Sequence, residues 1–389
     1  MPSTQPPLST TLPPLVCGTA TFNNQYNPDA FAIPTNAIIQ RALELGVRAF
    51  DTSPYYGPSE TLLGAALNTS HVQSHYPRSS YHILTKVGRI GGSEFDYSPE
   101  WVRYSIQRSL QRLHTSYLDV VYCHDVEFVT PQEVLVAVQE LRRIRDTQGT
   151  IKYIGISGYP VPLLCELAEL VLKKTGEPLD AVMSYANFTL QNTTLMTKGI
   201  EKLRRAGVSV VPNASPLGMG LLRSVGVPIG GKGDFHPSPV ELRRKVMEAA
   251  NFVKNKGEKI EVVAIRWALE RWARDGATVG GIGGIGVSVM GVSNLDELEE
   301  TMRVWNSVLD GLPIPRRQVK MEKLAWSLER QKEIEALANS IWEILADLKD
   351  YTWASPDESF VNIRVVKGVV DEVAPLPEIK EHLLKVSRL

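Results

Sequence analysis

Short runs of apolar, mostly β-branched residues recur along the chain, and between them lie longer segments in which apolar residues repeat every three or four positions. A short apolar run is typical of a buried strand, whereas the longer repeat is typical of an amphipathic helix. Because the two patterns alternate, the sequence predicts βα units that build a parallel sheet. The expected strands cover residues 15–19, 47–51, 81–86, 117–124, 151–157, 180–184, 208–212 and 287–293.

Three segments carry local signals for the start of a helix. Ser98 precedes Pro99, and the apolar positions 102, 106, 110 and 113 then fall on one helical stripe. Residues 130–133 (TPQE) and 238–241 (SPVE) each combine a hydroxyl N-cap, a proline at the first helical position and a glutamate at the third. We therefore expect Ser98, Thr130 and Ser238 to cap three helices.

Eight strands in about 280 residues match the usual size of a (β/α)₈ barrel, with a doubly wound open sheet as the alternative. We expect a loose, Pro-, Ser- and Thr-rich lead-in over residues 1–14, the barrel over 15–357, and a C-terminal tail over 358–389. Within the barrel unit, a further helix is expected at 321–348. Residues 281–286 spell GxGxxG, but a helical pattern precedes them and a strand follows. A nucleotide-binding loop needs the reverse order, so this segment is interpreted as a connection.

Composition narrows the class of protein. The 389 residues are 43% hydrophobic and 22% charged with a formal net charge of −1, which does not favour nucleic acid or a membrane surface as a partner. No apolar run is long enough to span a bilayer, and the first residues lack the features of a secretory signal. Three widely spaced cysteines predict reduced thiols in the cytoplasm, and no Cys/His cluster has the spacing of a metal site.

Polar residues end several of the expected strands, where the active sites of parallel barrels lie. Asp51, Lys86 and His124 each end a run, and two tyrosines, Tyr55 and Tyr56, follow Asp51. Singly, these residues fit a helix cap, a surface cation and a core histidine. Together they predict acid–base chemistry, because an ammonium held by a carboxylate lowers the pKa of a nearby phenol. A hydride that moves with the proton must come from a cofactor.

The chain resembles the aldo-keto reductases, whose motifs it carries in the family's order between residue 15 and about residue 305. The motifs are GT (18–19), DTSPYYG (51–57), LTKVG (84–88), YLDVVYCH (117–124), IKYIGIS (151–157), ASPLGMG (214–220) and GVSNLDELEE (291–300). The resemblance implies a (β/α)₈ barrel that uses a nicotinamide cofactor. It also implies the catalytic tetrad Asp51, Tyr56, Lys86 and His124, where Tyr56 is chosen over Tyr55 because the family's tyrosine directly precedes the glycine.

The same resemblance implies two sets of binding residues. The cofactor is expected to contact Gly18, Thr19, Ala20, Asp51, Ser157, Met183, Ser215, Leu217, Gly218, Gly291, Ser293, Glu297 and Glu300. The substrate is expected to contact Phe22, Tyr55, Tyr56, His124 and Asp125. Three positions depart from the family: Gly158 stands for an asparagine, Met183 for a glutamine and Ala214 for a tyrosine.

Within the family, the patterns around residues 183–185, 213–217 and 348–353 resemble the aldose dehydrogenases. This implies a small sugar as the substrate, D-arabinose or else L-galactose or L-fucose, oxidised at its anomeric carbon to the lactone. Loops of the C-terminal part are expected to line the pocket. An NADPH-dependent aldehyde reductase and a non-catalytic subunit resembling potassium-channel β subunits are the alternatives.

The segment after the eighth strand predicts the choice of cofactor. Residues 294–300 (NLDELEE) contain four carboxylates and no cation, and Glu297 stands where NADP-using members often have arginine. A carboxylate accepts hydrogen bonds from a ribose 2′-hydroxyl and repels a 2′-phosphate. The sequence therefore predicts NAD as the cofactor.

Overall fold

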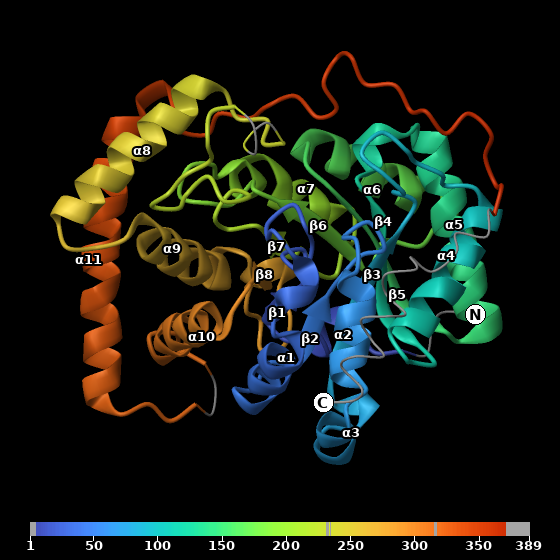
Figure 1. Ribbon diagram of the computed structural model, residues 1–389, viewed down its shortest axis with the longest axis horizontal. Helices are drawn as coiled ribbons and strands as arrows, with labels where there is room; N and C mark the ends of the chain where they lie inside the picture. The colour runs from blue at the N-terminus through green and yellow to red at the C-terminus, as the bar shows by residue number, and fades with distance from the viewer. Residues whose placement is uncertain (1–4, 231–232, 234, 315–316, 371–389) are drawn as a thin grey trace.

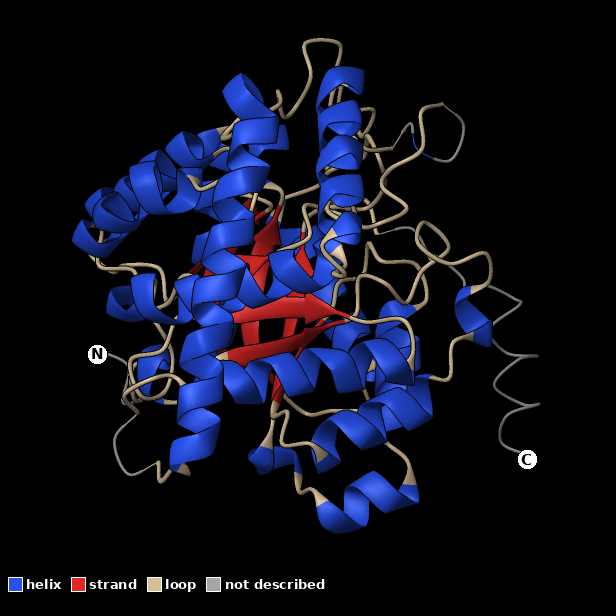
Figure 2. Cartoon of the chain, turned by 90° about the vertical axis from the view of Figure 1, so that its left-hand side faces the viewer, coloured by secondary structure: helices blue, strands red, loops and turns tan. Residues whose placement is uncertain are grey.

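The computed structural model describes residues 5–230, 233, 235–314 and 317–370. Its eight parallel strands form a closed barrel in which each strand pairs with the next along the chain and β8 pairs with β1. Figure 2 shows the barrel at the centre of the molecule with helices around it. The predicted (β/α)₈ fold is confirmed, and the open sheet is excluded. The strands are β1 (Leu15–Gly18), β2 (Ala49–Asp51), β3 (His82–Val87), β4 (Leu118–His124), β5 (Ile151–Gly158), β6 (Ala181–Tyr185), β7 (Asn213–Ala214) and β8 (Ser288–Gly291).

Helices fill the connections between strands and bury their apolar faces against the barrel (Figure 1). None of those in the described ranges is long and apolar enough to cross a membrane. The predicted helix at 321–348 is confirmed, as α11 and the 3₁₀ turn that follows it. The helices are α1 (Thr35–Glu44), α2 (Ser59–Leu67), α3 (Ser70–His75), α4 (Pro99–Arg112), α5 (Pro131–Gln148), α6 (Val161–Thr175), α7 (Ile200–Arg205), α8 (Val240–Asn255), α9 (Ile260–Asp275), α10 (Leu295–Asp310) and α11 (Met321–Leu345).

The seventh strand lies further along the chain than the apolar pattern predicts. Residues 208–212 were expected to form it, but there only Val210 makes an isolated bridge, to Ala181. The ladder to both neighbours begins at Asn213, which pairs with Ser184 and Ser288. Pro212 has no N–H to give to a ladder, so regular pairing starts after it.

Two of the three expected helix caps are present. Ser98 accepts the backbone N–H of Trp101, and Thr130 forms a capping box with Glu133. The third expectation is wrong, because α8 begins at Val240 without a side-chain cap. The Ser238 hydroxyl instead accepts a hydrogen bond from Nε of Arg243, 3.1 Å away.

Residues before β1 close the N-terminal mouth of the barrel. Leu8 and Leu12, expected in a loose lead-in, are fully buried in the cluster that fills the barrel, and a 3₁₀ turn (Leu8–Thr10) holds them there. The glycine-rich segment 281–286 lies at the same end, where the N–H of Ile282 donates to the carbonyl of Leu12. It connects a helical turn to β8, as predicted, at the mouth opposite to the strand ends that carry Asp51 and Lys86.

After α11, the chain crosses the C-terminal mouth of the barrel. In Figure 1 this segment is the red trace that leaves α11 and passes over the top of the molecule toward α4 and α5. Its anchors include the side chain of Gln191, which donates to the carbonyls of Leu348 and Tyr351, and the side chain of Asn362, which pairs with the backbone of Phe95. Residues 371–389 of the expected tail lie outside the described residues, and the division at residue 357 stays a prediction.

Candidate active site

A cavity of about 1110 Å³ opens at the C-terminal ends of the strands. It extends from the ends of β2, β3 and β4 to the segments that follow β7 and β8, and the C-terminal segment walls one side. Most of the predicted site residues line it, from the tetrad at one end to the carboxylates after β8 at the other. The lining residues among them are Gly18, Ala20, Asp51, Tyr55, Tyr56, Lys86, His124, Asp125, Ser157, Met183, Ser215, Leu217, Gly291, Ser293, Glu297 and Glu300.

Three predicted residues do not line this cavity. Thr19 is fully buried, and its hydroxyl bonds the carbonyl of Asp51 and the hydroxyl of Ser59, so it supports the β1–β2 ends from behind. The ring of Phe22 is fully buried in the hydrophobic core. Gly218 closes a turn in which its N–H donates to the carbonyl of Ser215. The structure does not place these three residues in the cavity wall.

Lys86 and Asp51 form a buried ion pair at the base of the cavity. The ammonium Nζ lies 2.7 Å from Oδ1 of Asp51 and 2.9 Å from the carbonyl of Thr52. Oδ2 of Asp51 is buried without a hydrogen-bond partner in the described chain, and burial raises the pKa of this carboxyl despite the charge of Lys86. The pair is formed by neighbouring strands, β2 and β3, which explains how residues 35 positions apart meet.

Tyr56 stands between this ion pair and His124. Its ring centroid lies 4.9 Å from Nζ of Lys86 and 5.6 Å from the imidazole, which is perpendicular to it. Burial and the charges of Asp51 and Asp125 raise the pKa of Tyr56 well above 10.0. From the sequence, we expected Lys86 to lower the pKa of Tyr56, and that expectation is wrong in direction. The ammonium of Lys86 donates its hydrogen bonds to Asp51 and to the carbonyl of Thr52 instead. The phenol is therefore the resting form of Tyr56.

His124 is a neutral imidazole with a defined orientation. Burial lowers its pKa to about 3, so its ring carries no charge at neutral pH. Nδ1 lies 3.0 Å from the hydroxyl of Ser53, which itself accepts the N–H of Tyr55 and so has its own O–H to donate. With Nδ1 as the acceptor of this hydrogen bond, the imidazole proton lies on Nε2, the nitrogen 3.6 Å from the carboxylate of Asp125. Ser53 was missed from sequence, although it lies in the DTS motif.

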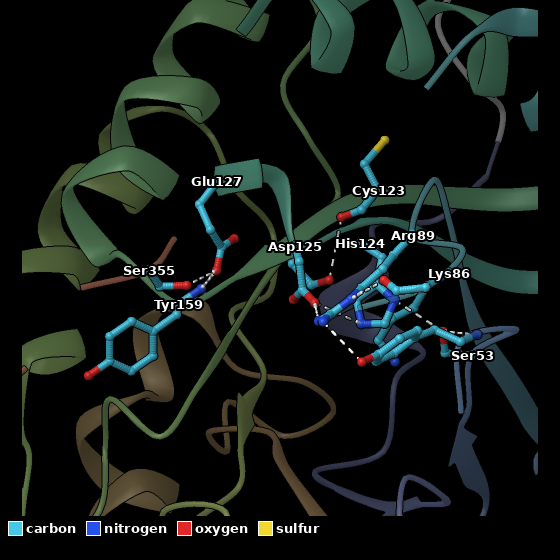
Figure 3. A network of polar contacts seen from close by, with 12 residues as sticks. Ser53, Lys86, Arg89, Cys123, His124, Asp125, Glu127, Tyr159 and Ser355 are labelled. Atoms are coloured by element: carbon cyan, nitrogen blue, oxygen red, sulfur yellow. Dashed lines mark hydrogen bonds and ion pairs between the residues drawn. The ribbon is translucent and has the colours of Figure 1, made fainter. Parts of the chain in front are cut away.

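Arg89 is a second residue that the sequence reasoning missed. It lines the cavity two residues after β3, forms an ion pair with Asp125 and donates to the hydroxyl of Tyr55 at 3.0 Å. Figure 3 shows its guanidinium beside Asp125 and His124. No family motif marked it, because its partners come from the loop after β2 and the end of β4. The only signal in the sequence was its place just after the LTKVG motif.

The far end of the cavity surrounds the N-terminus of α10. Asn294 caps this helix, and the N–H of Ser293 donates to Oε2 of Glu297 at 2.8 Å. Oε1 of Glu297 lies 3.2 Å from the guanidinium of Arg223. The expectation that this region lacks a cation holds for the segment 294–300 but not for the folded site, because Arg223 and Lys259 line the same cavity.

The shape and the donors of this cavity fit a dinucleotide. A helix N-terminus and the ammonium of Lys259 at one end suit a pyrophosphate, whereas the guanidinium of Arg223 is paired with Glu297. Ser157 from β5 and Met183 and Tyr185 from β6 also line the cavity. Gly291 also lines the cavity, and a Cβ at this position would lie 3.1 Å from the side chain of Thr21. A nicotinamide cofactor would extend from the tetrad to α10.

The segment after α11 forms part of the cavity wall, as we expected for loops of the C-terminal part. Trp353 lines the cavity and stacks on Tyr159 at 4.5 Å between ring centroids. Ser355 donates to Oε1 of Glu127, which also accepts the N–H of Tyr159 (Figure 3). Ser359, Phe360, Val361 and Ile363 also line the cavity.

Comparison with known proteins places the chain in a family. A model of the aldo/keto reductase family matches residues 14–314. The D-arabinose 1-dehydrogenase of Saccharomyces cerevisiae is 44% identical over 288 residues, which are 74% of this chain and 81% of that protein. The L-galactose dehydrogenase of Arabidopsis thaliana is 32% identical over 325 residues, 82% of this chain and 86% of that protein. This chain belongs to the aldo/keto reductase family.

A third relative, the D-threo-aldose 1-dehydrogenase of a Pseudomonas species, is 26% identical over 272 residues, 63% of this chain and 78% of that protein. The chain is thus an oxidoreductase of the aldo/keto reductase family with aldose dehydrogenases among its relatives, and the predicted resemblance to that branch is confirmed. Members of the family use nicotinamide cofactors. The roles assigned to individual residues stay predictions.

The departure from the aldo/keto reductase pattern at Gly158 has a physical reason. A Cβ at this position would lie 2.4 Å from Oε2 of Glu127, so the Glu127 carboxyl occupies the space of a side chain at 158. Oε2 is buried without a partner in the described chain, and burial together with Asp125 raises the pKa of Glu127 to about 8. Asparagine at 158 is therefore incompatible with Glu127 in its present place.

Proposed function

We propose that this protein oxidises the anomeric carbon of a free aldose to the aldonolactone and transfers the hydride to NAD⁺. D-arabinose is the first candidate, with L-galactose and L-fucose as further ones. The observation that carries the proposal is the constellation of Tyr56, His124 and the Lys86–Asp51 pair at one end of a cavity that fits a dinucleotide. The aldose dehydrogenases among the relatives support the substrate class.

Tyr56 and His124 have separate roles in the proposed reaction. The C1 hydroxyl of the sugar binds between Tyr56 and His124, and the N–H at Nε2 of His124 donates a hydrogen bond to the sugar oxygen. A nicotinamide held beside the tetrad would supply the acceptor for the C1 hydride. Tyr56, as phenolate, takes the proton of the C1 hydroxyl, so the sugar loses two electrons and two hydrogens, and the products are a lactone, NADH and a proton. Such a positioned acid–base pair contributes on the order of 10²–10⁴ in rate.

NAD⁺ is proposed over NADP⁺ because Glu297 lies at the expected adenosine end. Its carboxylate already neutralises Arg223, so a 2′-phosphate would meet an anion and a cation that is not free. The alternative, an NADPH-dependent aldehyde reductase, is favoured by one observation, the presence of Arg223 and Lys259 on the same wall. Three buried thiols without disulfides among the described residues support the cytoplasm as the compartment.

A panel of free aldoses, assayed with NAD⁺ and with NADP⁺ by the absorbance of the reduced nicotinamide, tests the proposal. We expect turnover with D-arabinose and NAD⁺, loss of nearly all turnover in Tyr56→Phe, and retained NADH binding in that variant. Tyr55→Phe, a matched change on the neighbouring phenol, should alter mainly KM. Equal losses in the two variants would refute the assignment of Tyr56, and turnover of simple aldehydes with NADPH alone would favour the alternative.

A further inference from the structure

We propose that Arg89 and Asp125 form a subsite that binds adjacent hydroxyl groups of the sugar next to the reacting carbon, and that this subsite selects neutral aldoses. The inference rests on the proposed function, whose sugar it describes in more detail. It adds Arg89 to the groups that touch the substrate and assigns a joint role to the pair.

The Arg89–Asp125 pair lies beside the imidazole of His124. Asp125 directly follows His124, and its Oδ2 lies 3.6 Å from Nε2 of that imidazole while it also pairs with Nη1 of Arg89. Nε2 faces the C1 oxygen in the proposed complex. In an aldose with a hydroxyl on C2, that hydroxyl is the one nearest to the C1 oxygen, so it comes to lie beside Oδ2 and the guanidinium.

The fold holds Arg89 in place before any substrate arrives. Gly88 has a φ of +100°, and a Cβ there would lie 2.2 Å from the ring of Tyr97, whose hydroxyl donates to the carbonyl of His124 at 2.5 Å. This contact ties the loop after β3 to the end of β4. An isolated bridge between Arg89 and Phe95 closes the loop on itself. A group fixed in this way loses little conformational entropy on binding.

The hydrogen-bonding inventory of the pair matches a diol. Arg89 donates from Nε to the carbonyl of Gly91, from Nη1 to Asp125 and from Nη2 to Tyr55, so two of its five N–H groups have no partner within the described chain. Its side chain is 17% exposed, and both Arg89 and Asp125 line the cavity. A sugar hydroxyl both donates and accepts, so two neighbouring hydroxyls suit a carboxylate beside a guanidinium.

The charge of the pair selects the class of sugar. Asp125 neutralises Arg89, and Asp51 likewise neutralises Lys86. The charges of these two cations at this end of the cavity are therefore compensated. A uronic acid or a sugar phosphate would have to displace Asp125 to pair with Arg89. An aldehyde without hydroxyls would leave the buried donors and acceptors unpaired, which is a strong ground for rejection.

The test compares D-arabinose with its 2-deoxy analogue in the wild type and in Arg89→Leu. We expect the wild type to prefer D-arabinose. In the variant, kcat/KM for D-arabinose should fall by on the order of 10²-fold, mainly through KM, whereas the value for the 2-deoxy sugar should change by less than about threefold. Asp125→Asn should reduce the preference for D-arabinose over the 2-deoxy sugar. Arg103→Leu, which breaks an ion pair between Arg103 of α4 and Glu140 of α5 outside the cavity, is the matched control and should leave both values unchanged.

NADH binding confirms that each variant is folded, and calorimetric binding of each sugar to the protein with NADH provides a readout that does not need turnover. If the wild type binds the sugars but oxidises neither, the proposed function fails while the binding preference still tests the subsite. An equal loss for both sugars in Arg89→Leu, in turnover and in binding, would overturn the subsite. A preference of the wild type for a uronic acid over the neutral sugar would also overturn the subsite.

Discussion

The buried pair of Lys86 and Asp51 is the residue-scale foundation of the site. Two opposite charges inside the barrel are tolerated because each compensates the other, and removing one leaves the other uncompensated. At this scale, the sequence was sufficient to find these groups, since Asp51 and His124 end strands and Lys86 is one residue before the end of β3. It was not sufficient to find Arg89, because its partner Asp125 lies just after β4, 36 residues further along the chain.

Lys86→Met should therefore reduce stability as well as activity. The substitution leaves Asp51 as a buried charge without its cation, which typically costs about 3–5 kcal/mol of unfolding free energy. Asp51→Asn should be milder in both respects, because the lysine keeps its bond to the carbonyl of Thr52. Denaturant unfolding together with kcat measures the two effects. A Lys86→Met protein with wild-type stability would contradict the description of this pair.

The pH dependence of aldose oxidation should be governed by Tyr56 and not by His124. Oxidation needs the phenolate, and burial raises the pKa of Tyr56, so kcat should rise from pH 7 toward about pH 10. The pKa of His124 is about 3, so no step should appear near the usual histidine value of 6.5. Initial rates across this range provide the measurement. A rate that reaches its plateau between pH 6 and pH 7 would show that a histidine, not the phenol, limits the reaction.

At the scale of elements, the strand ends and helix starts were largely predictable, and the failures have local causes. Strand β7 was misplaced because an apolar run at 208–212 outweighed the effect of Pro212 on the ladder. The cap at Ser238 failed because Arg243 binds its hydroxyl. The contact between the turn after β4 and the C-terminal segment, through Glu127 and Ser355, was not predictable, since 228 residues separate the two.

Glu127→Gln should make stability less dependent on pH. The native carboxyl has a pKa of about 8 against an ordinary value of 4.5, so between these values the folded protein binds a proton that the unfolded chain releases. Native stability therefore falls as the pH rises from 4.5 through 8, by up to about 1.4 kcal/mol per pH unit. The glutamine cannot ionise, so its advantage over the wild type should grow with pH. Tm values at pH 5 and pH 8.5 test this, and an equal difference at both would contradict it.

At the scale of the whole molecule, closure of the barrel brings together residues that no local pattern connects. The alternation of strands and helices was enough to predict the barrel and the mouth at which the site lies. The walls of the cavity were harder to predict, because the loop after β7 contributes Arg223, α8 is followed by Lys259, and the segment after α11 contributes Trp353. Charge at the adenosine end thus depends on the fold as well as on the segment 294–300.

Changes at Glu297 test the cofactor choice. Glu297→Gln should release Arg223 from its ion pair and raise kcat/KM with NADP⁺, and Glu297→Arg should narrow or reverse the preference for NAD⁺. Glu300→Gln changes a second carboxylate on the same wall that forms no ion pair with Arg223 among the described residues, and it serves as the comparison for a general loss of negative charge. If Glu300→Gln raises NADP⁺ use as much as Glu297→Gln does, the specific role of Glu297 is wrong.

The central claim is hydride transfer from the anomeric carbon of a free aldose to NAD⁺. The most direct measurement incubates the protein with D-arabinose deuterated at C1 and NAD⁺, and follows both products by nuclear magnetic resonance and mass spectrometry. We expect deuterium in the reduced nicotinamide, an equal amount of the deuterium-free lactone, and neither product with Tyr56→Phe. Deuterium retained at C1, or no reduced cofactor with any aldose of the panel, would contradict the claim.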